Sequence, residues 1–169
     1  HPNKHDIVIR NNTFTGQEKQ MVYGVMIKNI TIVGNTLTMK SFTQSDFRAI
    51  DLRTKLEGII NITGNNIVLS GTSYANAVYL GPTSAANCPE GTVMNIVNNA
   101  ISVNSQTTSL SSAVQVRYAR EVNLLYNTLL VHSEGSNSAP LAVYYAANMQ
   151  LTATNNLMQN TGETGLAVY

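Results

Sequence analysis

One eight-residue segment recurs six times along the chain, and it restricts the possible folds more strongly than any other feature of the sequence. Its common form is apolar, x, apolar, x, x, Asn, x, apolar, and successive copies start 23, 30, 34, 28 and 29 residues apart. A repeat of this length indicates stacked units, each burying its apolar side chains against its neighbours. The copies lie at 7–14, 30–37, 60–67, 94–101, 122–129 and 151–158, with asparagines at Asn12, Asn35, Asn65, Asn99, Asn127 and Asn156.

A second, shorter element lies between successive copies and pairs a small residue with a β-branched one. Its β-branched residues are 25, 28, 36, 29 and 25 positions apart, so both elements share one period. Both alternate apolar and polar residues with a period of two, which is typical of β-strands. We therefore predict that each unit has a first strand followed by two strands that flank the asparagine. The first strands are expected near 24–28, 49–53, 77–81, 113–117 and 141–145.

The turn beside the repeated asparagine is too short to reverse the chain without a glycine-rich hairpin turn. It can bend a strand sharply if one residue takes the left-handed backbone conformation, which asparagine accepts better than other non-glycine residues. Stacked asparagines can also hydrogen-bond through their side-chain amides. We therefore predict a ladder in which asparagine supplies both the left-handed turn and the stacked amide.

At these residues the chain resembles the pectate-lyase-like superfamily of right-handed parallel β-helices. The resemblance covers essentially the whole chain and implies an all-β fold of about six rungs, forming a single domain over residues 1–169. Such stacks have open ends that natural proteins cover, and neither terminus reads as an amphipathic helix. We therefore expect this domain to be uncapped at both ends and to belong to a longer solenoid, or to be capped by other chains.

The residue that opens each short element is small in every unit. Strict alternation predicts that these residues point outward, where a loop of the chain, a bound glycan or a second copy packs closely over them. A homotrimer is one candidate assembly. The column consists of Gly24, Ala49, Ala77, Ala113, Ala142 and Ala167.

In the resembled family, ligands lie along the outer face of the first strand. Alternation predicts one outward column of Met26, Asp51, Tyr79, Gln115 and Tyr144, and a second of Lys28, Arg53, Gly81, Arg117 and Ala146. Guanidinium groups pair bidentately with carboxylates, so a strip of this kind suits an acidic sugar chain. The alternative is an exposed Asp51–Arg53 ion pair on an ordinary β surface. The candidate catalytic residues are Asp51, Arg53 and Arg117, and the candidate substrate-binding residues are Lys28, Tyr79, Gln115 and Tyr144.

Two mechanisms can be weighed against these residues. A glycoside hydrolase needs two carboxyl groups about 5–9.5 Å apart. Asp51 has no acidic neighbour in its predicted column, so its partner would have to come from Glu57, Glu90 or Glu121. A uronate lyase needs a cation to neutralise the substrate carboxylate and a base to remove the α-proton. Lyase chemistry fits slightly better, because Arg53, Arg117, Lys55 or Tyr79 can supply those roles.

Composition narrows the range of partners. A formal charge of +1 and the absence of a Lys- and Arg-rich run argue against binding to nucleic acid or an anionic membrane. No apolar stretch is long enough to cross a bilayer, and no cluster of residues predicts a metal or another cofactor. The abundance of Asn, Ser and Thr favours an extracellular protein, whether secreted, cell-surface or virion-associated. Three functions stay open: a polysaccharide-degrading enzyme or tailspike domain, a non-catalytic adhesin or glycan-binding module, and the structural shaft of a trimeric viral fibre.

Overall fold

The computed structural model describes residues 6–16, 19–41, 46–107, 109–162, 166 and 168. Within these ranges the chain forms β-strands and one short 3₁₀ turn, η1 (Ala85–Asn87), and it contains no α-helix. The strands pair in parallel, forming a six-stranded and a nine-stranded sheet. The predicted all-β fold built from parallel strands is therefore confirmed.

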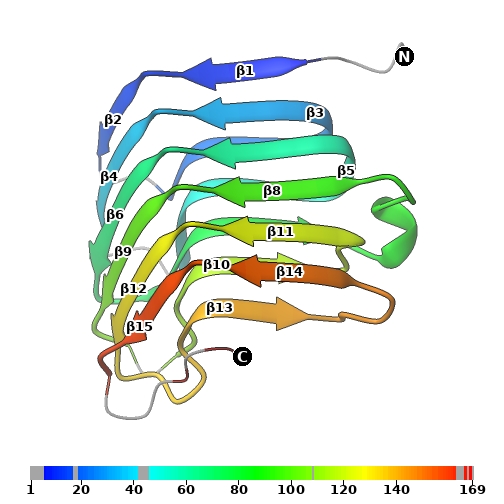
Figure 1. Cartoon of the computed structure of the whole chain (residues 1–169). Coiled ribbons are helices and arrows are strands. Elements are labelled where there is room, and N and C mark those ends of the chain that lie inside the picture. Colours follow the sequence, from blue (N-terminus) through cyan, green and yellow to red (C-terminus); the bar gives the residue numbers. More distant parts are fainter. Residues whose placement is uncertain are drawn as a thin grey trace.

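The six-stranded sheet makes one side of the molecule, at the left of Figure 1. It contains one strand from each repeat, namely the strand that follows the asparagine. We call this sheet the third wall. Its strands are β2 (Thr13–Gly16), β4 (Thr36–Ser41), β6 (Asn66–Gly71), β9 (Ala100–Ser105), β12 (Thr128–Ser133) and β15 (Leu157–Asn160).

The nine-stranded sheet is strongly curled, because β3 (Gln20–Val33) and β5 (Asp46–Thr63) each run through both of its halves. The first wall contains the N-terminal parts of β3 and β5 with β7 (Tyr74–Pro82), β10 (Ser112–Arg117) and β13 (Ala139–Tyr144). The second wall contains their C-terminal parts with β1 (Ile7–Arg10), β8 (Val93–Val97), β11 (Glu121–Leu125) and β14 (Gln150–Thr154). Successive units of the chain thus pass the first, second and third walls in order (Figure 1).

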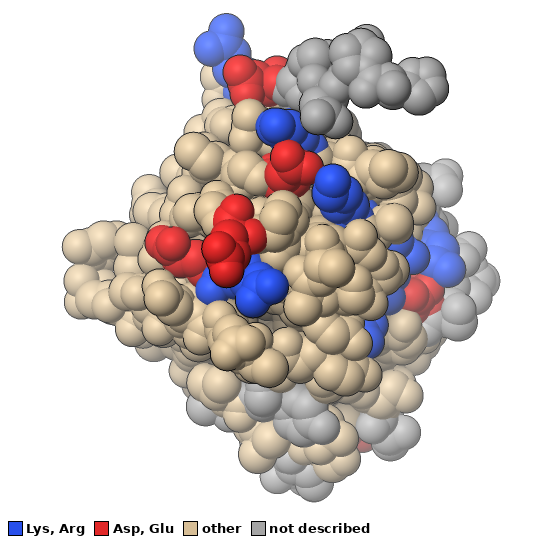
Figure 2. Space-filling model, turned by 90° about the vertical axis from the view of Figure 1, so that its right-hand side faces the viewer, with Lys and Arg blue, Asp and Glu red and all other residues tan. Residues whose placement is uncertain are grey.

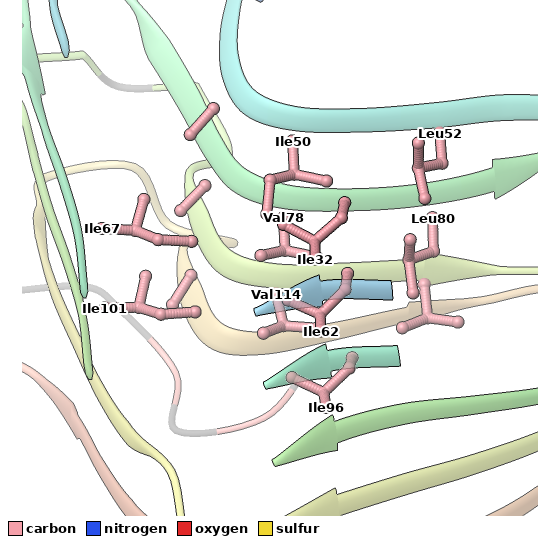
Figure 3. Close-up of a cluster of buried hydrophobic side chains, with 14 of the residues drawn as sticks. Ile32, Ile50, Leu52, Ile62, Ile67, Val78, Leu80, Ile96, Ile101 and Val114 are labelled. Carbon is pink, nitrogen blue, oxygen red and sulfur yellow. The ribbon is translucent and has the colours of Figure 1, made fainter. Parts of the chain in front are cut away.

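The apolar core fills the space between the three walls, and equivalent residues of successive units stack on one another (Figure 3). Ile32, Ile62 and Ile96 are register partners on the second wall, where they are fully buried. Ile50, Val78 and Val114 form the corresponding stack on the first wall, and Ile67 and Ile101 belong to the third wall. The alternation that marked these strands in the sequence therefore directs their β-branched residues into one continuous core.

The asparagine ladder lies at the corner between the second and third walls. Both the backbone N–H and the side-chain amide of Asn65 donate to Oδ1 of Asn99, at 2.9 and 3.0 Å. The same amide also donates to the carbonyl oxygens of Ile32 and Thr63. Equivalent links join all six asparagines, so the predicted ladder is confirmed.

The prediction that the ladder asparagine itself takes the left-handed conformation is wrong. The residue before it does so, with φ values of +55° to +65° at Asn11, Gly34, Gly64, Asn98, Tyr126 and Asn155. The two requirements of the turn are thus divided between neighbouring residues. One supplies the backbone conformation, and the ladder asparagine supplies the amide.

The prediction of an outward column of small residues is also wrong. Ala49, Ala77 and Ala113 are fully buried members of the apolar core. Each precedes another core residue, as Ala49 precedes Ile50, so strict alternation is interrupted at this point of the first wall. Gly24 pairs with Leu52 and Ala142 with Gln115, so neither belongs to the column, and Ala167 lies outside the described residues. The column therefore gives no argument for a homotrimer.

Candidate functional site

The outer face of the first wall brings together most of the residues predicted for the site. One column contains Asp51, Tyr79 and Gln115 in register on β5, β7 and β10. The next column contains Arg53, Gly81, Arg117 and Tyr144, so Tyr144 lies beside Arg117. The sequence prediction had placed Tyr144 in the first column. The prediction was two residues out of register, because Val143 pairs with Val116 and not with Val114.

Lys28 does not belong to this face, and its predicted place in the strip is wrong. Its ammonium group lies 3.2 Å from Glu57, which also pairs with Lys55 at 3.1 Å. The position opposite Asp51 is occupied by Tyr23, three residues before the predicted Met26. This difference arises because β3 has fewer residues than β5 between its first-wall part and its second-wall part. The pairing of the two strands is accordingly irregular near Val25 and Lys28.

Asp51 is the buried centre of an ion-pair network. Its carboxylate has no exposed surface and accepts hydrogen bonds from Arg48 Nη1 at 3.3 Å, from Arg53 Nε at 2.9 Å, from Arg53 Nη2 and from Gln20. The hydrogen bond from Arg53 to Asp51 is the main cause of a raised Arg53 pKa. Asp51 therefore holds two guanidinium groups in place, and its own oxygen atoms are directed away from solvent.

Arg48, which the sequence prediction missed, is the second buried element of the network. Its Nη2 lies 2.8 Å from Asp46, and Asp46 also pairs with Lys19 at 2.8 Å. Burial alone would raise the pKa of Asp46, but the hydrogen bond from Lys19 and the charge of Arg48 lower it overall. Strict alternation counted from Ile50 would direct Arg48 into the interior. The interruption at Ala49 turns it outward.

Tyr74 completes this network by donating a hydrogen bond from its hydroxyl to Asp46 at 2.9 Å. Burial, together with this bond to an anionic acceptor, raises the pKa of Tyr74 from 10.0 to about 12. Between these two values the unfolded chain loses the Tyr74 proton while the folded chain keeps it. The unfolded state then binds fewer protons, so the contribution of Tyr74 to stability is present below pH 10 and decreases above it.

We expect wild-type protein to lose stability between pH 10 and 12 more steeply than Tyr74→Phe, which lacks the shifted group. Urea unfolding of both proteins at several pH values in this window measures the difference. The remaining tyrosines titrate in both proteins and cancel in the comparison. Parallel stability curves for the two proteins would contradict the assignment.

Tyr79 lies flat across Gly81, in the gap that the glycine leaves between Arg53 and Arg117. A Cβ atom built at Gly81 would come within 2.1–2.6 Å of the Tyr79 ring and hydroxyl, so a side chain at this position would displace the tyrosine. Arg117 Nη1 donates to the Tyr79 hydroxyl at 3.0 Å. The guanidinium groups of Arg48 and Arg53 lie 4.4 and 5.8 Å from the ring centroid. Three cationic side chains therefore surround one tyrosine.

Aromatic side chains continue the site beyond Arg117. Its guanidinium lies 6.0 Å from the Tyr144 ring and 5.2 Å from the Tyr145 ring. Tyr145 stacks on Tyr118 with their centroids 4.3 Å apart and their planes 2° apart. Both residues of this pair have positive φ, which is costly for bulky side chains and is found most often at functional sites. Tyr145 nevertheless stays 56% exposed, so core packing does not explain its conformation.

The site carries an excess of positive charge. Lys19, Arg48, Arg53 and Arg117 contribute four cations, against the two carboxylates of Asp46 and Asp51. Among the described residues, no carboxylate pairs with Arg117, and the Nε groups of Arg48 and Arg117 are buried without a hydrogen-bond partner. In the side view of Figure 2, several basic side chains lie along the right-hand part of the surface with an acidic one among them, and a second group of acidic and basic side chains lies nearer the centre.

A pocket of about 270 Å³ opens within this site. Gln115 lines it, which places this predicted residue at the wall of the pocket. The other lining residues include Arg48, Tyr74, Asn76, Tyr79 and Arg117. The pocket therefore combines buried guanidinium donors with aromatic and amide side chains, a set suited to a polar anionic ligand.

No protein-family model, curated protein or solved structure matches the chain. Over the described ranges, the structure contains no helix with the length and apolar character of a membrane span. The same ranges contain no group of three or more His, Cys, Asp or Glu side chains that could hold a metal ion. The interpretation of the site consequently rests on its own geometry and charge.

Proposed function

We propose that the chain is a right-handed parallel β-helix domain of the pectate-lyase-like class that binds an acidic polysaccharide along the outer face of its first wall. The observation that carries this proposal is the excess of positive charge in a strip of exposed and half-buried tyrosines. Guanidinium groups recognise carboxylates, and tyrosine rings offer flat amphipathic surfaces to sugar rings. An acidic glycan presents both features to one surface.

The low charge of the chain and its content of Asn, Ser and Thr support an extracellular setting, whether secreted, cell-surface or virion-associated. A purely structural shaft is a weaker explanation for this face. A shaft has no need of buried unpaired guanidinium donors beside a pocket, and leaving such donors unpaired costs free energy. A pocket lined by the guanidinium groups of Arg48 and Arg117 suits a ligand with anionic oxygens.

A second candidate function is cleavage of the bound polysaccharide by β-elimination. It is favoured by the Tyr79 hydroxyl, which accepts a hydrogen bond from Arg117 and lies in the gap beside Arg53. In this reaction the phenolate form of Tyr79 takes the proton α to a uronate carboxylate and then gives it to the leaving oxygen, while the arginines neutralise that carboxylate. The C–H electron pair forms a carbon–carbon double bond, and the glycosidic oxygen leaves and takes up a proton.

Glycoside hydrolysis is supported less well by the same geometry. A hydrolase needs a carboxylic acid that keeps its proton, with a raised pKa. Asp51 is buried in an ion-pair network, and the pKa of Asp46 is lowered. Glu57 is occupied by Lys28 and Lys55, away from the strip. Asp51 fits a positioning role for Arg48 and Arg53 better than a catalytic one.

Removing two strip cations by Arg53→Ala together with Arg117→Ala tests the binding proposal. We expect affinity for polygalacturonate or hyaluronan fragments to fall by about a hundredfold or more, since charge-assisted hydrogen bonds contribute about 1.5–3 kcal/mol each. Isothermal titration calorimetry at fixed ionic strength measures the change. Lys28→Ala together with Lys55→Ala removes the same charge elsewhere and should leave affinity within about threefold, as exposed pairs contribute little.

Equal losses in the two double variants would show that net charge, and not the strip, governs binding. Retained binding in the arginine variant would remove the strip from consideration. Circular dichroism and thermal unfolding of each variant establish that the fold is intact before affinities are compared. Ultraviolet absorbance of unsaturated uronate products separately tests β-elimination, with Tyr79→Phe as the variant expected to bind and not to cleave.

A further inference from the structure

The strip on the first wall alternates between aromatic and cationic side chains, one per strand. Crossing β3, β5, β7, β10 and β13, it consists of Tyr23, Arg53, Tyr79, Arg117 and Tyr145, the last lying directly after β13. Each neighbouring pair is in contact. Arg53 lies 5.4 Å from the Tyr23 ring centroid and 5.8 Å from that of Tyr79, and Arg117 reaches the Tyr79 hydroxyl at 3.0 Å and the Tyr145 ring at 5.2 Å.

The parallel pairing gives this alternation a fixed spacing. Neighbouring strands lie about 4.8 Å apart, so five strands span about 19 Å and the two arginines repeat at about 9.6 Å. The repeat depends on Gly81, which is the register partner of Arg53 and carries no side chain; it follows Leu80, the partner of Val116, so it lies level with Arg117 as well. Tyr79 fills that gap with an uncharged ring. A cation therefore stands at every second strand position.

Both arginines retain hydrogen-bonding capacity for a ligand. Arg53 uses Nε and Nη2 to hold Asp51, and within the described chain no hydrogen bond involves its Nη1. Arg117 has no carboxylate partner among the described residues, and it lines the pocket. The terminal tyrosines Tyr23 and Tyr145 are 53% and 56% exposed, and one face of the Tyr145 ring is covered by Tyr118.

We propose that the ligand is a polysaccharide in which acidic and uncharged sugars alternate, and that its chain axis crosses the strands of the first wall. This inference rests on the proposed function and specifies its ligand. Neighbouring strands are about 4.8 Å apart, which is close to the length of one pyranose unit in an extended chain. Carboxylates on every second sugar then meet Arg53 and Arg117. The uncharged ring between them passes over the position of Tyr79, which is buried, and the rings beyond them lie on the exposed Tyr23 and Tyr145. A polymer with a carboxylate on every sugar would place unpaired anions on the tyrosine faces.

The test compares two polyanions of matched length by isothermal titration calorimetry at one ionic strength. Hyaluronan fragments carry one carboxylate per disaccharide, and polygalacturonate fragments carry one per sugar. We expect hyaluronan to bind at least about tenfold more tightly, although it carries half the charge. Equal affinity, or affinity that rises with charge density, would overturn the alternating ligand and leave acidic-polysaccharide binding standing. Failure of both polymers to bind would overturn both proposals.

Tyrosine variants test the uncharged positions separately. Tyr23→Asn together with Tyr145→Asn removes the two terminal rings, and asparagine is compatible with the positive φ of Tyr145. We expect this variant to lose at least about fivefold in affinity for hyaluronan and to change little toward polygalacturonate, since each aromatic ring adds a favourable contact with a sugar ring. Tyr126→Asn is the control, because Tyr126 is 60% exposed with φ +57° at the ladder corner, outside the strip. A loss of hyaluronan affinity no larger in the double variant than in this control would contradict the stacking role.

Discussion

Replacing Asp51 with alanine is expected to lower the free energy of unfolding by about 3–5 kcal/mol, the cost of removing one partner from a buried ion pair. The carboxylate has no exposed surface, and Arg48, whose side chain is only 9% exposed, depends on it for charge compensation. Arg53 would lose the partner that its Nε and Nη2 both contact. Asp51→Asn keeps the shape and part of the hydrogen bonding, so its loss should be smaller.

Glu57→Ala provides a matched control for this prediction. Glu57 is also a carboxylate between two cations, Lys28 and Lys55, but all three side chains are substantially exposed. Its removal should cost less than about 1 kcal/mol, because solvent screens exposed pairs. Urea unfolding of the two variants measures the contrast. Similar values would mean that Asp51 is far less buried in solution than in the structure.

Asn65→Ala is expected to lower the free energy of unfolding by about 3–4 kcal/mol, since each buried polar group left unpaired costs about 1–3 kcal/mol. The substitution removes the acceptor of the Asn35 backbone and side-chain N–H groups. It also removes the donor to the carbonyl oxygens of Ile32 and Thr63. Asn65→Gly should lower the free energy of unfolding by the same amount as Asn65→Ala, to within about 1 kcal/mol, because Asn65 is not the left-handed residue of the turn.

Gly64 allows the backbone part of the turn to be measured alone. Its φ is +62°, and a Cβ built there meets no atom within 4 Å, so a substitution tests conformation and not space. Gly64→Asn should be tolerated, since Asn11, Asn98 and Asn155 occupy equivalent positions with φ near +55°. Gly64→Val should lose about 1–3 kcal/mol. If Asn65→Gly proves much milder than Asn65→Ala, the division of roles within the turn is wrong.

The repeat predicted the strands, their parallel stacking and the ladder, because these follow from residues that recur in every unit. Side-chain direction on the first wall was predicted less well, and the reason is local. Strict alternation assumes an unbroken pleat, whereas Ala49 and Ile50 are consecutive core residues. Because of this interruption, Ala49 points inward and Arg48 points outward, which is the opposite of what strict alternation predicts. Within the sequence of a single unit, no residue type indicates where the alternation is interrupted.

The candidate site shows the same limit. Asp51, Arg53, Tyr79 and Arg117 were correctly grouped, because β5, β7 and β10 are in register with no shift over these residues. Tyr23 was missed because fewer residues separate it from the ladder corner than separate Asp51 from the ladder corner of the next unit. Tyr118 and Tyr145 directly follow the register partners Arg117 and Tyr144, so the two-residue register error at β13 concealed their stacking. Connection lengths, which the repeat leaves variable, decide these contacts.

The asparagine ladder also has an electrostatic consequence, because its amide dipoles all point the same way. Each ladder asparagine donates to the Oδ1 atom of the next unit, as Asn99 does to Asn127. A second, surface row on the second wall has the opposite polarity, since Asn123 donates to Asn95 and Asn95 donates to Asn61. Glu121 fixes the orientation of this row, because its ionised carboxylate can only accept a hydrogen bond from the Asn123 amide. The two rows are therefore antiparallel chains of amide dipoles, and their fields oppose each other along the axis of the stack. Within each row, neighbouring amides can polarise one another cooperatively. Because the two rows oppose each other, the molecule does not accumulate a large dipole along this axis.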